Sequence, residues 1–418
     1  MSDTPEWFAQ GWPHIWLPYA QMQTVSPPLP VVGAAGSRLQ LADGRELVDG
    51  ISSWWSTCHG YQHPHIVQAI QQQAGTLSHV MFAGLAHAQP YQLAQRLCTF
   101  TRMGMERVFF AESGSVAVEI AMKMALQYWR NKGEPKRTKF IYFTHGYHGD
   151  TMGAMGVSSD SDFKGAFSSL TLKNYQLDIP HDEYSFAEFA DTVAAIRGQV
   201  AALIMEPLVQ GAGGMKFHSA DILSEIRRVC REQEILFIAD EIATGFGRTG
   251  NLFACHEAAI EPDILCLGKA LTGGHMPLAA TLAKAHVFDA FLGDSYERAL
   301  MHGPTYMAHA IGCAAANASL DLFEREPRLA QAEALEQKLW DGLKHLQGRS
   351  GVRDVRVKGA IGVIEMECSR DDVLRMRADA LTYGVWLRPF GNILYVTPPL
   401  TITDTDLALL LQAMDRLV

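Results

Sequence analysis

The feature that most constrains the fold is an alternation of short apolar segments with longer helical ones, which begins near residue 60. Each apolar run is brief and nearly free of polar side chains, as strands covered on both faces are. Strands that alternate with helices lie side by side and mostly parallel. The sequence therefore predicts an α/β fold with a mostly parallel sheet. The predicted strands are RVFFA (107–111), KFIYF (139–143), AALIMEP (201–207), ILFIAD (235–240) and DILCLG (263–268).

Helical patterns and a second set of strands complete the predicted organisation. Asp43-Gly44 is typical of a hairpin turn between two short strands near the N-terminus. Three more strands are predicted near the C-terminus, in DVRVKG, GVIEMEC and ILYVTPP. We expect helices over 65–80, 115–130 and 308–326. The expected division is an N-terminal segment (1–49) that joins the small domain, a large domain (50–308), and a smaller C-terminal α/β domain (309–418).

Composition narrows the function classes. The net charge of −10, with no run of Lys or Arg, argues against nucleic acid as a partner. No apolar run approaches the roughly 18 residues of a membrane helix, and the N-terminus lacks the pattern of a signal peptide. The seven cysteines form no C-x-x-C pair, as in reduced proteins. We expect a cytoplasmic protein with no membrane partner and no metal.

Two polar residues end apolar strands and are candidates for chemistry. Asp240 ends ILFIAD, and Lys269 follows DILCLG. A buried lysine is costly unless it is paired or neutral, and a neutral amine is what Schiff-base chemistry requires. A nearby carboxylate is the usual partner of a pyridinium nitrogen. Spacing alone leaves a second interpretation open, in which Asp240 caps a loop and Lys269 lies on the surface.

Glycine-rich segments offer two possible phosphate sites. Ser113-Gly114-Ser115 lies between a strand and a helix, where backbone N–H groups can bind an anion, although a plain N-cap serine would look the same. Gly245-Phe-Gly247-Arg-Thr-Gly250 matches G-x-G-x-x-G, but residues separate it from the strand and no long helix follows. Nicotinamide binding is therefore disfavoured.

The segment DEIATGFGRTG (240–250), followed by PDILCLGKALTGG (262–274), resembles the class III aminotransferases, which are pyridoxal phosphate (PLP) enzymes of fold type I. The resemblance runs from about Trp16 to Pro399. It implies that Lys269 forms the Schiff base and acts as general base and acid, and that Asp240 keeps the ring nitrogen protonated. It also implies that Gly114 and Ser115 bind the phosphate.

The same resemblance assigns further residues. Tyr147 is expected to stack on the cofactor ring and to contribute to catalysis, although His145, His148 and Asp150 beside it also permit a metal interpretation. In the family, the segment that contains Gly303, Pro304 and Thr305 crosses a dimer interface. Gly303 would then lie at the substrate, and Pro304 and Thr305 at the partner's cofactor. The implied assembly is a homodimer with shared active sites.

Other residues concern the substrate. Trp54, Trp55 and Tyr19 predict an aromatic pocket wall, and Arg388 predicts a carboxylate contact, although core packing and an internal salt bridge are the alternatives. Such a pocket, with Tyr147 and Lys269, fits 8-amino-7-oxononanoate as amino acceptor. The resemblance implies S-adenosylmethionine as donor in a PLP/PMP ping-pong reaction of biotin biosynthesis. Glu206 ends another strand and is either part of the site or a solvated acid.

Alternatives remain open at this stage. Lysine could replace S-adenosylmethionine as donor, and another omega-aminotransferase or an aminomutase would share most of these motifs. A non-catalytic protein of the same fold is disfavoured because both Lys269 and Asp240 are present.

Overall fold

The computed structural model describes residues 4–159 and 164–418 and is built around a seven-stranded sheet. The strand order is β4-β12-β11-β10-β7-β5-β6. Its strands are β4 (Arg107–Ala111), β5 (Lys139–Phe143), β6 (Tyr175–Leu177), β7 (Val200–Met205), β10 (Leu236–Asp240), β11 (Ile264–Leu267) and β12 (Ala279–Ala283). Every pairing is parallel except those of β12, which runs antiparallel to both β4 and β11. The predicted mostly parallel sheet is confirmed.

Two strands of this sheet, β6 and β12, were not predicted from the sequence. A parallel return needs a crossover of a dozen or more residues, usually a helix. Between β11 and β12 the chain makes only a short 3-10 turn (Lys269–Thr272) and a reversal at Gly273 and Gly274. Strand β12 therefore runs antiparallel to β11. The turn between them places Lys269 just beyond the carboxyl end of β11.

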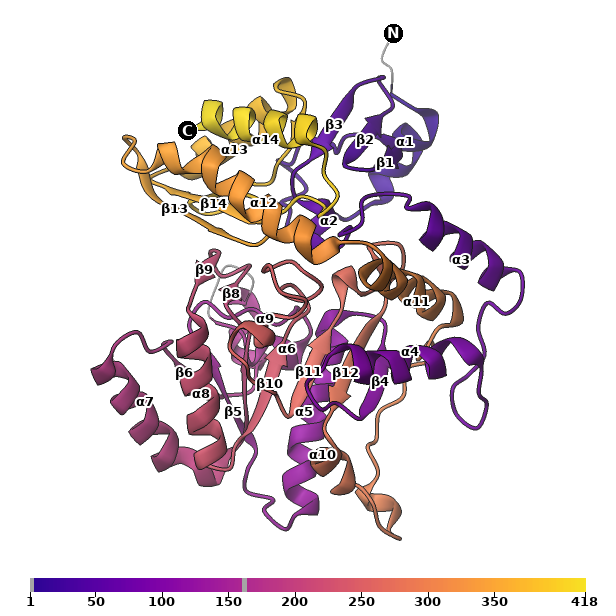
Figure 1. The fold of residues 1–418 in the computed structure, drawn as a ribbon, viewed down its shortest axis with the longest axis vertical. Helices are drawn as coiled ribbons and strands as arrows, with labels where there is room; N and C mark the ends of the chain where they lie inside the picture. Colours follow the sequence, from indigo (N-terminus) through magenta and orange to yellow (C-terminus); the bar gives the residue numbers. More distant parts are fainter. Residues whose placement is uncertain (1–3, 160–163) are drawn as a thin grey trace.

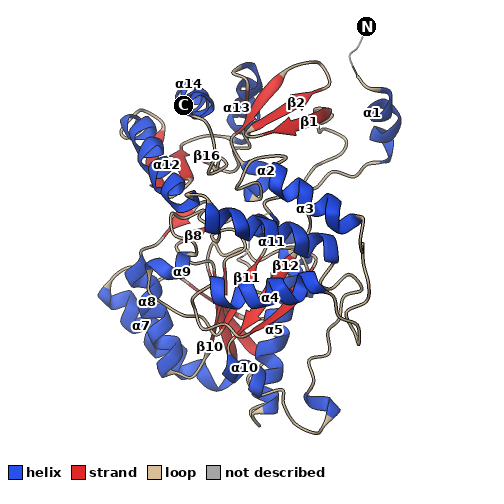
Figure 2. Cartoon of the chain, turned by 45° about the vertical axis from the view of Figure 1, so that its right-hand side comes forward, coloured by secondary structure: helices blue, strands red, loops and turns tan. Residues whose placement is uncertain are grey.

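Helices cover both faces of the sheet (Figures 1 and 2). The long helix α5 (Gly114–Asn131) packs on the middle strands, while α4 (Ala88–Phe100) packs on β4 and α8 (Ala220–Glu232) on β10. The expected helix over 65–80 is too long, because α3 (Pro64–Ala74) ends at Gly75, whose N–H bonds Gln71 O. The following helix α4 was not predicted.

A second lobe lies at the top of Figure 1 and combines the two ends of the chain. Its four-stranded sheet has the order β1-β2-β3-β15, in which β15 from the C-terminal part runs parallel to β3. A three-stranded antiparallel sheet, β13-β14-β16, lies in the same lobe. The strands are β1 (Val31–Ala35), β2 (Arg38–Leu41), β3 (Glu46–Asp49), β13 (Val352–Lys358), β14 (Ile361–Met366), β15 (Val385–Trp386) and β16 (Ile393–Val396), with helices α12 (Arg328–Leu343), α13 (Arg370–Thr382) and α14 (Asp404–Leu417).

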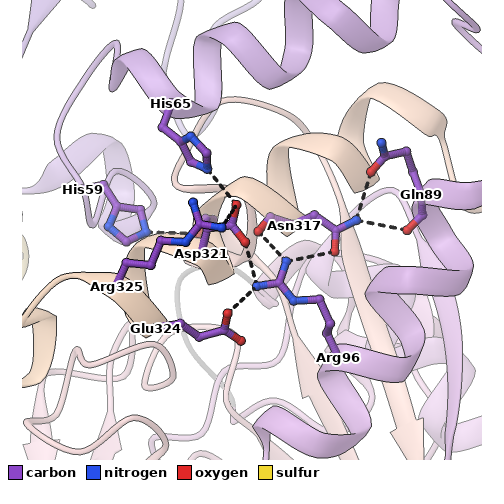
Figure 3. A network of polar contacts seen from close by, with 9 residues as sticks. His59, His65, Gln89, Arg96, Asn317, Asp321, Glu324 and Arg325 are labelled. Atoms are coloured by element: carbon purple, nitrogen blue, oxygen red, sulfur yellow. Dashed lines mark hydrogen bonds and ion pairs between the residues drawn. The ribbon is translucent and has the colours of Figure 1, made fainter.

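Helix α11 (Ala310–Arg325) packs on α3 and α4 through a polar network (Figure 3). Asp321 contacts His65 Nε2 at 2.7 Å and Arg96 at 2.9 Å, and Asn317 donates to Gln89 O at 3.1 Å. This network fixes two helices of the large lobe against the helix that leads into the small one.

The described chain also contains further α-helices and one small ribbon. They are α1 (Glu6–Gly11), α2 (Ser52–Trp55), α6 (Met152–Met155), α7 (Glu183–Ile196), α9 (Ala254–Glu257), α10 (Ala285–Asp289) and a two-stranded ribbon of β8 (Val209–Gln210) and β9 (Lys216–Phe217). Within residues 4–159 and 164–418, no helix combines the length and the apolar character that a membrane crossing demands.

Candidate active site

A cavity of about 250 Å³ opens beside Lys269 at the edge of the large sheet. Open parallel sheets bind ligands at the carboxyl ends of their strands, and the first residues of α5 face this opening. The cavity brings together the strand-end lysine and the start of α5, which the sequence predicted as separate features. It is lined by Ser56, Glu112, Ser113, Gly114, Lys269, Gly274, Met276, Pro277 and Leu278.

Lys269 presents its amine to this cavity. The expectation of a buried lysine is wrong in one respect, because its side chain is exposed to the opening. The protein that surrounds the rest of the side chain desolvates the ammonium and lowers the pKa of Lys269, while Asp240 and Glu206 oppose that shift. Its Nζ lies 5.3 Å from the centroid of the Trp55 ring. A lysine held in this way is biased toward the neutral, nucleophilic amine.

Asp240 is buried at the end of β10, with 3% of its surface exposed. Its Oδ2 lies 2.7 Å from His148 Nδ1, and its Oδ1 accepts the backbone N–H of Ile242 at 3.1 Å. His148 is also buried, and its Nε2 has no hydrogen-bond partner in the described part of the chain. The pair places a hydrogen-bonded carboxylate where a protonated ring nitrogen could be held.

Tyr147 lies in a polar cluster beside this pair. Its backbone N–H donates to Glu206 at 3.0 Å, and its hydroxyl donates to Asp150 Oδ1 at 3.0 Å. Tyr19 donates to the other oxygen of Asp150, and its hydroxyl lies 3.4 Å from that of Tyr147. Burial raises the pKa of both tyrosines. Two uncharged hydroxyls and an exposed carboxylate therefore meet in this cluster.

Glu206 follows β7 and is buried rather than solvated. It accepts the backbone N–H groups of Tyr147 and Gly211, both at 3.0 Å. Burial raises the pKa of Glu206 to about 7, with His148 lowering it and Asp240 raising it further. The interpretation of Glu206 as a solvated loop acid is therefore wrong. Its carboxyl group fixes the backbone that carries Tyr147.

Trp54 and Trp55 lie on a four-residue turn, Ser52–Trp55, in which every residue has positive φ. Left-handed backbone costs an L-residue other than glycine roughly 1–2 kcal/mol. The turn directs the two rings differently. Trp55 is 6% exposed beside Lys269, whereas Trp54 is 46% exposed, with its ring centroid 6.5 Å from that of Tyr19 in an edge-to-face arrangement. Trp55 is buried, as the alternative of core packing predicted, although its ring also contacts Lys269. Trp54 is too exposed to be a core residue.

Arg388 lies just after β15, with its guanidinium carbon 5.6 Å from the centroid of the Trp54 ring. No ion pair joins Arg388 to a carboxylate among residues 4–159 and 164–418, so the internal salt bridge considered from the sequence is absent there. A half-buried guanidinium without a carboxylate partner is suited to a ligand carboxylate. Arg388, Trp54 and Tyr19 thus form a cationic and aromatic wall.

The start of α5 presents backbone N–H groups of the kind that bind an anion. Ser113 is the N-cap residue and accepts from Val116 N at 3.4 Å, and Gly114 lines the cavity. Ser115 does not line it, and its hydroxyl contacts Thr151 Oγ1 at 2.8 Å. A side chain at Gly149, which has φ +123°, would collide with Ser115. The structure thus brings Gly114 to the cavity, while Ser115 Oγ is engaged with the neighbouring loop.

Gly303, Pro304 and Thr305 do not line the cavity at Lys269 among the residues that the structure describes. Gly303 and Thr305 are exposed. Lys123 Nζ donates to Met301 O and lies 3.2 Å from His302 Nδ1, which holds this segment against α5. In a single chain these residues therefore remain apart from the site to which the sequence assigned them.

Sequence reasoning missed the roles of His148 and Asp150. Both were considered only as possible metal ligands, yet one contacts Asp240 and the other contacts Tyr19 and Tyr147. No group of three His, Cys, Asp or Glu side chains suited to a metal ion occurs in the described parts of the chain. The signal was available, because HGYHGD follows a strand at the carboxyl edge of the sheet.

Comparisons with known proteins agree with this geometry. The family model for aminotransferase class-III matches residues 19–418. The adenosylmethionine-8-amino-7-oxononanoate aminotransferase of Synechococcus elongatus is 44% identical, with 94% of this chain and 96% of the relative covered. The crystal structure of the enzyme of that name from Methanocaldococcus jannaschii matches with a TM-score of 0.94 and 34% identity, covering 98% of each chain. An amine transaminase from an uncultivated Pseudomonas species, in a PLP-bound form, matches with a TM-score of 0.91 and 33% identity, covering 96% of this chain and 98% of that one.

Proposed function

The chain belongs to the class III aminotransferases, and on this premise we propose that it transfers an amino group from S-adenosylmethionine to 8-amino-7-oxononanoate. The product would be 7,8-diaminononanoate, a precursor of biotin. The observation that supports this assignment most directly is the likeness over nearly the full length to relatives that carry these substrates in their names. The guanidinium of Arg388, which lies beside Trp54 and has no carboxylate partner in the described part of the chain, supports an acceptor with a carboxylate and an apolar chain.

The cofactor is PLP, and the residues of this chain fit it. A carboxylate held by a buried histidine suits the pyridine nitrogen, and the backbone N–H groups of Gly114 and Ser115, at the start of an 18-residue helix, suit the phosphate. The amine of Lys269 faces the same cavity. When bound, PLP supplies the aldehyde carbon that takes up the amino group and the ring that accepts electrons from the substrate Cα.

Residues of the protein would transfer the proton and hold the cofactor. Lys269 would remove the proton from the substrate Cα as general base and deliver it, as general acid, to the cofactor carbon that carried the aldehyde, and its lowered pKa favours the first of these roles. Asp240, oriented by His148, holds the proton on the ring nitrogen. We propose that the backbone around Gly114 and Ser115 binds the phosphate and that the Tyr147 ring packs on the cofactor.

The substrate wall comprises Tyr19, Trp54, Trp55 and Arg388. Arg388 would bind the carboxylate of the keto acid, and the exposed face of Trp54 would contact the aliphatic chain. Asp150, bonded to both Tyr19 and Tyr147, provides a negative charge at the opening, where a cationic donor would enter. A donor that carries both an ammonium and a sulfonium group would be attracted to that charge.

We propose a homodimer with shared active sites, in which Gly303, Pro304 and Thr305 complete the partner's site. The ring centroids of His79 and Tyr306 lie 4.6 Å apart. Loop 77–87 and the segment 301–306 therefore contact each other and form one surface. Apolar side chains on this surface are half exposed in the single chain, namely Met81 (56%), Leu85 (51%), Tyr91 (58%), Met301 (53%) and Tyr306 (55%). Exposed apolar surface of this kind marks an interface. We also propose that the chain divides into the segment 1–49, a large domain (50–308) and a small domain (309–418). The enzyme would be cytoplasmic, which agrees with its seven cysteines all being free thiols.

Two experiments test the proposal. Candidate amines are added singly to the holoenzyme, and the cofactor absorbance shows which one donates. S-adenosylmethionine should do so, whereas a response to lysine alone would replace the donor, and a response only to simple amines would move the chain to an amine transaminase such as its structural relative. Mixing Lys269→Ala with Thr305→Ala subunits tests shared sites, because hybrid dimers would contain one intact site and regain activity. If hybrid dimers are shown to form and their activity does not recover, the active sites are not shared.

A further inference from the structure

The turn Ser52–Trp55 is unusual because it is left-handed throughout. The φ angles of its residues are 48°, 46°, 57° and 73°, and no glycine is present. Two bonds of the i to i−4 type close it, from Trp55 N to Ile51 O and from Ser56 N to Ser52 O, both at 2.9 Å. A backbone conformation that side chains disfavour persists only where surrounding contacts impose it.

The contacts come from Asp49, at the end of β3 and fully buried. Its Oδ1 accepts Ile51 N–H at 2.9 Å, and its Oδ2 accepts Ser53 N–H at 2.8 Å. The hydroxyl of Tyr61 donates to the same Oδ2 at 2.5 Å and lies 2.7 Å from Ser53 Oγ. A single carboxylate thus binds the entry and the middle of the turn, and Tyr61 braces it.

The base of the turn is tied to the small lobe. Gly50 N donates to Trp386 O at 3.0 Å, and Ser52 Oγ donates to Thr397 O at 2.7 Å. Trp386 is the last residue of β15, directly before the segment that carries Arg388. The tip of the turn reaches Lys269 through Trp55 and Arg388 through Trp54. The turn therefore sets the position of both rings relative to residues from two lobes.

We propose that Asp49, braced by Tyr61, is a positioning residue that holds Ser52–Trp55 in its left-handed conformation and thereby directs Trp54 and Trp55 into the active site. This inference rests on the proposed function only in taking the two tryptophans as walls of the substrate site. Neither Asp49 nor Tyr61 needs to touch the substrate, since each acts through the backbone of the turn.

Asp49→Asn tests the proposal. The amide keeps the size of the side chain, but one of its two ends becomes a donor and faces an N–H or O–H donor. We expect KM for the keto acid to rise about tenfold while kcat falls less, because Lys269, Asp240 and His148 lie on other elements. The near-ultraviolet circular dichroism of the holoenzyme without substrate should change, since Trp54 and Trp55 lose their fixed orientation.

A second substitution tests the mechanism. Glycine adopts positive φ without steric cost, so Ser53→Gly should restore the turn in the Asp49→Asn background. Recovery of KM and of the dichroism in Asp49→Asn/Ser53→Gly would support the proposal, because an unrelated structural defect would not respond to glycine at that position. Failure of Ser53→Gly to restore either signal would overturn it.

Asp406→Asn is the matched control. Asp406 is another buried carboxylate of the same lobe, bonded to Ser37 and Arg38, and it does not contact the turn. We expect it to lower the melting temperature without changing KM or the tryptophan dichroism. An equal rise in KM in Asp406→Asn would overturn the proposal, because the effect would then be general loosening of the lobe.

If Asp49→Asn does not fold, Tyr61→Phe carries the test, with an expected rise in KM of roughly two- to tenfold from loss of the hydroxyl contacts to Asp49 and Ser53. Unchanged KM and dichroism in that variant would overturn the proposal. KM is measured with whichever keto acid the enzyme accepts, and the dichroism needs no substrate. An error in the assigned acceptor therefore leaves both readouts interpretable and is distinguishable from failure of this inference.

Discussion

Replacing Arg388 by alanine should separate the two half-reactions of the enzyme. The guanidinium lies over the Trp54 ring with no carboxylate partner in the described chain, so the contact it would make with the keto acid is a new, charge-assisted one. Loss of such a hydrogen bond costs roughly 1.5–3 kcal/mol. At about 1.4 kcal/mol per factor of ten, kcat/KM for the acceptor should fall roughly ten- to a hundredfold.

Stopped-flow absorbance of the cofactor measures each half-reaction separately. The acceptor half-reaction should carry the loss, while the donor half-reaction should change little unless the donor carboxylate uses the same arginine. Arg388→Lys should recover part of the loss, because it keeps the charge but not the bidentate geometry. Arg416→Ala is a matched control, since Arg416 also lies over an aromatic ring in this lobe, 5.3 Å from the Tyr383 centroid.

The outcomes distinguish the roles of Arg388. Equal loss in both half-reactions would mean one carboxylate site shared by donor and acceptor. No loss in either would refute a role in substrate binding, and a similar loss in Arg416→Ala would show that the effect arises from packing.

Three further predictions follow from the site and from one buried histidine. Lys269→Ala should abolish turnover with the fold intact by circular dichroism, and borohydride reduction of the wild type should label Lys269 alone; label on another lysine would contradict the assignment. Asp240→Asn should retain PLP but lower kcat by orders of magnitude, because a neutral side chain cannot hold the ring-nitrogen proton; turnover near that of the wild type would exclude the role. Burial, with the nearby Arg328 cation, lowers the pKa of His59 well below 6.5, and Arg328 Nε donates to its Nδ1 at 2.9 Å. The folded protein thus binds fewer protons than the unfolded chain, so the stability due to neutral His59 is present above pH 6.5 and is lost below it, by at most about 1.4 kcal/mol per pH unit. His59→Gln should remove that part of the acid sensitivity in denaturant titrations at several pH values, and an unchanged pH dependence would contradict it.

Much of the fold could be predicted from the local pattern of apolar residues along the chain. Residues 107–111 and 139–143 are strands over the predicted ranges, because a run of apolar residues between turns has one stable place, inside a sheet covered on both faces. The hairpin at Asp43-Gly44 joins β2 and β3 as predicted. Lys269 and Asp240 could also be singled out from sequence as candidate site residues, since a charged residue at the end of an apolar strand is costly when it is buried without a partner.

Contacts between distant segments were decided only by the tertiary structure. The direction of β12 follows from the short turn at Lys269, and the pairing of β15 with β3 joins residues far apart in the chain. The contact between His148 and Asp240 spans 92 positions, and no periodicity encodes it. The left-handed turn at Ser52–Trp55 could not be predicted at all, because Ser-Ser-Trp-Trp has no preference for that backbone. The sequence indicated which residues are candidates for the chemistry, whereas buried hydrogen bonds between elements determined where their side chains point.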